Sequence, residues 1–114
     1  MLTMLSDVLT GPEKWAKGMT FGRHIAGVLI VSSQTEKWDC CCLIGACHLT
    51  DHLNLSLEAC VLALNELGFG PRSMPTRERQ AKHPIALFND HADTTWDDVS
   101  AVIQRADFLM KEPV

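Results

Sequence analysis

The strongest constraint on the fold is an amphipathic pattern between residues 95 and 110, near the end of the chain. Apolar side chains recur there every three or four residues, the spacing that places them on one face of an α-helix. Thr95 is placed to cap this helix, and Asp97 and Asp98 favour the positive end of its dipole. The apolar positions are Trp96, Val99, Val102, Ile103, Ala106, Leu109 and Met110. Such a face must pack against other elements, so the pattern predicts a compact domain with a helical core.

Two further helices are predicted from the same kind of spacing. Residues 2–9 form a short helical pattern, and residues 55–67 form a longer one. Asn54 or Ser56 offers a cap for the longer helix. Gly68 follows it, where a left-handed residue commonly ends a helix.

A β-hairpin and an exposed loop are predicted on either side of the long helix. Residues 18–32 are punctuated by glycine and end in a β-branched run, which indicates an antiparallel hairpin turning near Ala26 and Gly27. Residues 69–84 contain three prolines and five basic side chains, which predict an exposed loop with one helical turn at 77–81.

The segment WDCCCLIGACHLTDH, residues 38–52, holds four of the five cysteines and two of the five histidines. Asp39 is a candidate N-cap, so we expect a helix from that point to about Leu49. Its first turn would hold Cys40, Cys41 and Cys42. The apolar spacing favours most of these cysteines as small buried side chains.

Together these elements predict an α+β fold that is mainly α. We expect one compact, four-helix-like domain over residues 1–114, with a small β-hairpin at one edge.

The charge and hydropathy of the chain restrict its partners. The net charge of −4 disfavours binding to a phosphate backbone, which needs clustered Lys and Arg. The apolar run GVLIV is too short to span a bilayer, and no secretion signal precedes it. We therefore expect a cytoplasmic protein with reduced thiols, in agreement with its odd number of cysteines.

Metal binding is one alternative for the cysteine-rich segment. Zinc needs four converging thiolate or imidazole ligands, and Cys47 or His48 with His52 could supply the first pair. However, the chain has no Cys-x-x-Cys pair, and adjacent side chains on a helix diverge by about 100°. We favour buried thiols and solvent-facing histidines, and we expect no cofactor.

A catalytic cysteine is the second alternative. A thiol in the first turn of a helix has a lowered pKa, so Cys40 or Cys41 would qualify if exposed. His91, beside Asn89 and Asp90, is the best available base. The opposing interpretation is that Asn89 and Asp90 form a capped turn before the last helix, so an enzyme is not favoured.

A set of short motifs spread over most of the chain supplies a resemblance. They are Trp15-x-x-Gly18, Cys42-x-x-Gly45-Ala46, Phe88-Asn89-Asp90, Thr95, Asp98-Val99 and Ala106. In this order they resemble a family of small proteins of unknown function from bacteria and their phages, in which Trp is usual at the position of Phe88. The resemblance implies a phage or mobile-element setting in a bacterial host, and no assigned activity.

We therefore expect an accessory protein that binds a host protein or protein complex, with inhibition of a bacterial defence complex as one form of this function. The basic loop offers the candidate contacts Arg72, Arg77, Arg79 and Lys82. An ordinary solvated loop explains these residues equally well. A homodimer is a further alternative if the last helix exposes part of its apolar face.

Overall fold

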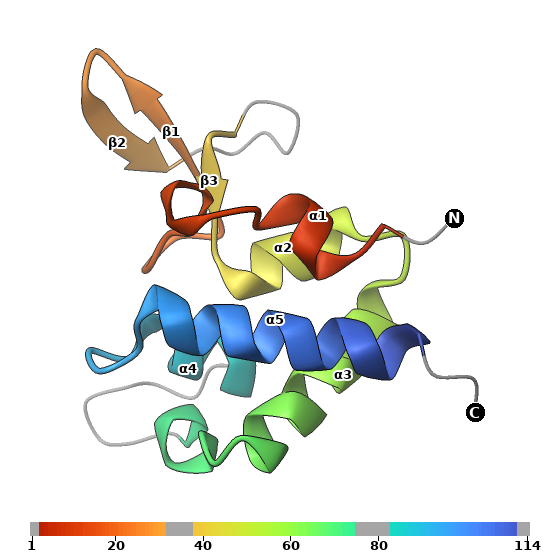
Figure 1. Cartoon of the computed structure of the whole chain (residues 1–114). Coiled ribbons are helices and arrows are strands. Elements are labelled where there is room, and N and C mark those ends of the chain that lie inside the picture. The colour runs from red at the N-terminus through yellow and green to blue at the C-terminus, as the bar shows by residue number, and fades with distance from the viewer. Residues whose placement is uncertain (1–2, 32–37, 75–82, 112–114) are drawn as a thin grey trace.

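The computed structural model describes residues 3–31, 38–74 and 83–111, and confirms an α+β fold that is mainly helical (Figure 1). The five helices and two 3₁₀ turns, in chain order with the strands, are α1 (Leu5–Val8), η1 (Pro12–Lys14), β1 (Phe21–Ile25), β2 (Val28–Val31), β3 (Cys40–Cys41), α2 (Leu43–Leu49), α3 (Leu53–Glu66), η2 (Gly70–Ser73), α4 (Pro84–Asp90) and α5 (Trp96–Lys111). Within the described ranges, no helix combines the length and apolarity needed to cross a membrane.

Helix α5 forms the centre of the molecule and confirms the amphipathic prediction. It packs along α3 and against α1, and its apolar face is buried. The Thr95 amide donates to Oδ2 of Asp98 at 3.1 Å, and the Asp98 amide donates to Oγ1 of Thr95 at 3.4 Å. This reciprocal pair satisfies two amides at the start of the helix.

A buried carboxylate on α5 holds the short helix α1 in place. The Leu5 and Ser6 amides donate to the two carboxylate oxygens of Asp107, at 2.9 and 3.2 Å. Asp107 is only 6% exposed, so a long-range contact stabilises a helix that is too short to persist alone. The helix is also shorter than the predicted 2–9, of which residue 2 lies outside the described part of the chain.

The sheet contains three antiparallel strands in the order β2-β1-β3. The hairpin turns at Ala26 and Gly27, as predicted, and both residues have positive φ, 51° and 81°. Two successive positive φ values are characteristic of the type I′ turn, whose twist matches that of the flanking strands. In Figure 1, β1 and β2 stand away from the helices, and β2 is the outer strand.

The predicted helix start at Asp39 is wrong. Cys40 and Cys41 pair with Gly22 and Phe21 of β1, and Cys42 is the extended N-cap of a helix that begins at Leu43. The Asp39 carboxylate instead accepts a hydrogen bond from the His24 amide. Pairing with a distant strand overrides the local helical spacing of these cysteines.

Other boundaries differ in smaller ways. Helix α3 begins at Leu53, after His52, and neither Asn54 nor Ser56 is its cap. Gly68 has the predicted left-handed conformation, with φ of 81°. Helix α4 occupies residues for which we expected the end of a loop and a turn. The helical turn predicted at 77–81 lies outside the described residues.

Candidate functional site

The candidate catalytic cysteines are buried in β3. Cys40 is 2% exposed and Cys41 is fully buried. Burial is the main cause that raises the pKa of both thiols, and the pKa of Cys41 reaches about 12. Because these residues do not lie in a helical turn, the helix dipole does not offset this burial. The arrangement therefore favours neutral, packed thiols over a nucleophilic thiolate.

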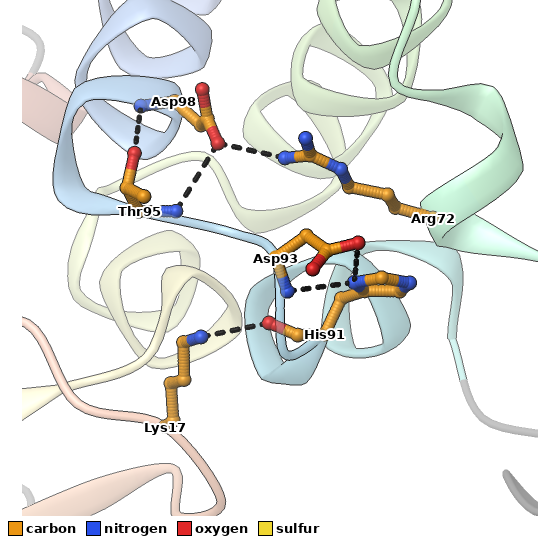
Figure 2. A network of polar contacts seen from close by, with 6 residues as sticks. All are labelled: Lys17, Arg72, His91, Asp93, Thr95 and Asp98. Atoms are coloured by element: carbon orange, nitrogen blue, oxygen red, sulfur yellow. Dashed lines mark hydrogen bonds and ion pairs between the residues drawn. The ribbon is translucent and has the colours of Figure 1, made fainter.

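The candidate base, His91, holds a turn at the end of α4 (Figure 2). Its Nδ1 accepts a hydrogen bond from the Asp93 amide at 3.0 Å. Its carbonyl oxygen accepts a hydrogen bond from Nζ of Lys17 at 2.7 Å. These contacts join His91 to its own turn and to the segment after η1, and none of them involves Cys40 or Cys41.

The candidate metal ligands point to different environments. Cys47 is fully buried, with its Sγ 3.9 Å from Sγ of Cys60, whereas His48 and His52 are exposed. The hydrogen bond between the two thiols lowers the pKa of Cys47, while the same contact and burial raise the pKa of Cys60. In the part of the chain that the structure describes, no three His, Cys, Asp or Glu side chains gather in a way that could hold a metal ion.

The candidate contact Arg72 makes interactions within the molecule (Figure 2). Its Nη1 lies 2.7 Å from Oδ2 of Asp98, and its guanidinium group stacks 5.0 Å from the centre of the Phe69 ring. Partial desolvation raises the pKa of Asp98, but hydrogen bonds from Arg72 and the Thr95 amide outweigh it, and the pKa is lowered. The other candidates, Arg77, Arg79 and Lys82, lie outside the described residues.

Three of the recognised motifs, those around Trp15, Cys42 and Phe88, meet in a junction centred on Asn89, which is fully buried. Its Oδ1 accepts hydrogen bonds from Nε1 of Trp15 at 2.7 Å and from the Leu43 amide at 3.0 Å. Its Nδ2 donates to the Ala16 carbonyl at 3.0 Å. One side chain thus ties α4 to α2 and to the segment after η1. We call this cluster the Asn89 junction.

The neighbouring motif residues extend the junction. The Gly18 amide donates to Oδ1 of Asp90 at 2.7 Å, and the Gly45 amide donates to Sγ of Cys42 at 3.3 Å. A Cβ at Gly45 would lie 2.5 Å from the Thr20 carbonyl oxygen, so this close approach requires glycine. A pocket of about 200 Å³ opens beside these residues. Burial raises the pKa of Cys42, so its thiol stays neutral at the pocket wall.

The outer strand β2 carries several exposed apolar side chains. Val28, Leu29 and Val31 are 60%, 41% and 66% exposed. These side chains lie on both faces of the strand, because successive residues alternate between faces. No charged residue or proline occurs between Ile25 and Val31. Edge strands are normally protected by such residues or by bulges, so this edge lacks the usual protection.

The direction of the free backbone groups follows from the pairing of β1. The Gly22 carbonyl accepts a hydrogen bond from the Asp39 amide, and the His24 amide donates to the Asp39 carboxylate, so both residues direct their backbone toward β3. Hydrogen-bonded and non-hydrogen-bonded pairs alternate along an antiparallel ladder. The backbone groups of Leu29 and Val31, which oppose His24 and Gly22, therefore point outward from β2. We call strand Val28–Val31, with these groups that no other described strand pairs, the open edge.

The open edge was not among the residues selected from the sequence. The run GVLIV identifies the strand itself, because its apolar residues fall on both faces. Such a strand is usually buried on both faces, so the run alone does not indicate an exposed edge. Which sides of this strand other elements cover depends on its position in the sheet, and that position is set by distant residues.

The chain belongs to DUF6197, a family of unknown function whose model matches residues 1–107. This membership confirms the expected relationship to a family without an assigned activity. Comparisons with curated proteins and with solved structures found no match.

Proposed function

We propose that this DUF6197 protein is a binding module that takes up an extended segment of a partner protein on its open edge. The observation that carries the proposal is the combination of exposed apolar side chains and outward-facing backbone groups on β2. In strand addition, backbone hydrogen bonds supply affinity and alternate side chains supply specificity. The open edge offers both kinds of contact.

The chemistry of the open edge favours a protein partner. Leu29 and Val31 offer amides and carbonyls in the pattern that another strand completes. Because no charged residue lies between Ile25 and Val31, the open edge has no cationic side chain that could pair with a phosphate backbone. An apolar, uncharged extended segment is the complementary ligand, because its side chains cover those of Val28, Leu29 and Val31 on both faces.

The positions of the other candidate groups support binding over catalysis. Asn89 and His91 make the hydrogen bonds that hold α4 against its neighbours, and the described thiols are buried. A polar group that holds the fold together is not available to a substrate without cost to stability. The open edge, in contrast, is exposed and makes no such internal contact on its outer side within the described part of the chain.

The resemblance to proteins from bacteria and their phages supports a setting for this activity. We propose an accessory role in which the partner is a host protein, with a bacterial defence complex as the target to test first.

The test is affinity capture of the partner from host lysate with two variants of the open edge. Val31→Lys places a charge on the edge, and Val31→Pro removes one outward-facing amide that β1 does not use. Leu62→Lys, at a 53% exposed position on α3, is the matched control for surface charge. We expect a stoichiometric partner with wild type and with Leu62→Lys, and loss of that partner with both Val31 variants. Equal capture by all four proteins would show that the open edge is not the binding surface.

A further inference from the structure

We propose that a second copy of this chain occupies the open edge at high protein concentration when no partner is bound, by antiparallel pairing of β2 with β2. This inference rests on the proposed function, since it describes the regulation of the same edge. Self-pairing hides the groups that the partner needs, so partner binding and dimer formation compete.

Antiparallel pairing of one strand with its own copy is self-complementary. A two-fold axis beside the middle of β2 places Leu29 of one copy opposite Val31 of the other, and the reverse. These are the residues whose amides and carbonyls point outward. Each free donor on one copy therefore meets a free acceptor on the other, and the two sheets become one continuous sheet.

The charge distribution favours this occupant. The chain has a net charge of −4, so two copies carry a net repulsion for each other. Residues 25–31 contain no charged side chain, so two open edges meet without repulsion between like charges. The nearest charged side chain on the hairpin, Arg23, belongs to β1 and is separated from the shared edge by one strand.

The shape of the molecule allows two copies to approach. The hairpin stands away from the helices, and β2 lies on the side facing away from β3 (Figure 1). Two hairpins can therefore meet edge to edge while the helical parts remain apart.

The size of the contact predicts a weak dimer. The exposed parts of Val28, Leu29 and Val31 add up to less than two whole side chains per copy. A stable specific interface typically involves about 20 to 30 residues on each side. A contact this small dissociates on dilution, so a partner that adds contacts beyond the strand can displace the second copy.

The experiment is sedimentation velocity on the purified full-length protein from low micromolar to near-millimolar concentration. We expect a monomer at the lowest concentration and a reversible dimer at the highest. Val31→Pro and Val31→Lys should remain monomeric throughout, while Leu62→Lys should dimerise like wild type. Circular dichroism of each variant verifies that it is folded.

Amide hydrogen exchange measured by NMR at both concentrations locates the contact. We expect the amides of Leu29 and Val31 to become protected only at high concentration, whereas those of Val28 and Ile30, already paired with β1, keep the same protection. A monomer at every concentration overturns the inference, as does a dimer that survives in both Val31 variants.

These outcomes are separable from those of the capture experiment. Capture through the open edge by a protein that is always monomeric refutes self-pairing and leaves the proposed function intact. A β2-dependent dimer without any captured partner supports self-pairing and refutes the proposed function.

Discussion

Replacing Asn89 with Ala should remove the central element of the Asn89 junction. The substitution deletes the acceptor for Trp15 and Leu43 and the donor for the Ala16 carbonyl. Trp15 is half-buried, so its indole N–H can find water, whereas Leu43 is fully buried and its amide loses its partner.

The expected loss of stability is large. A net hydrogen bond contributes about 1 kcal/mol, and a buried donor left unpaired costs about 1–3 kcal/mol. With two lost bonds and one stranded amide, we expect the free energy of unfolding to fall by about 3–5 kcal/mol. Because domains of this size are typically stable by about 5–15 kcal/mol, this is a substantial fraction of the total.

Urea denaturation followed by circular dichroism measures this loss. Trp15→Phe is the companion variant. It removes one partly exposed donor and part of the ring that contacts Trp96 and Lys17, and it should cost about 1–2 kcal/mol. In the double variant, the Trp15→Phe effect should be smaller by the share of the lost hydrogen bond, because its acceptor is already gone. A loss below about 1 kcal/mol for Asn89→Ala, or full additivity in the double variant, would refute the view that Asn89 joins these segments.

Two further predictions concern the packing and the charge around this framework. Gly45→Ala should lower the free energy of unfolding by about 1–3 kcal/mol, because the added Cβ would lie 2.5 Å from a backbone carbonyl oxygen. Gly70→Ala is the control: the nearest atom to its Cβ is 3.9 Å away, so the free energy of unfolding should change little in the same urea assay. Arg72→Met should reduce the acid sensitivity of folding. The pKa of Asp98 is lowered in the folded protein, so Asp98 stabilises the fold above its unfolded pKa, and this stability is lost as the pH falls through the folded pKa. The variant lacks Arg72, the main partner that lowers the pKa of Asp98. Parallel loss of stability with falling pH in wild type and Arg72→Met would contradict the second prediction.

Elements whose signals are local were predictable from the sequence. The repeat of apolar residues in α5, its cap at Thr95 and the turn at Ala26 and Gly27 each depend on neighbouring residues alone. Gly68 belongs to the same group, because a left-handed residue at a helix end favours glycine regardless of the rest of the fold.

Elements that depend on distant partners were not predictable. Cys40 and Cys41 have helical spacing with the residues after them, and only their pairing with β1 makes them a strand. Asn89 and Asp90 carry the pattern of a turn, yet they end a helix that begins at Pro84, a favourable first position. Apart from Asp90, the partners of Asn89 lie 46 to 74 residues away in sequence, so its burial could not be inferred from its neighbours.

The Asn89 junction and the open edge are connected through the base of the hairpin. The Cys41 carbonyl accepts a hydrogen bond from the Ala16 amide at 3.0 Å, and the Cys42 amide donates to the Thr20 carbonyl at 3.0 Å, so the segment that Asn89 holds also anchors β3. β3 in turn pairs with β1, which carries the outer strand. A substitution at Asn89 therefore disturbs the support of the hairpin as well as the core. Loss of partner binding in such a variant would not show that Asn89 contacts the partner, because the hairpin that carries the open edge would also be destabilised. Substitutions at Val31 act on the outward side of β2 and leave this support unchanged, which is why the binding surface must be tested there.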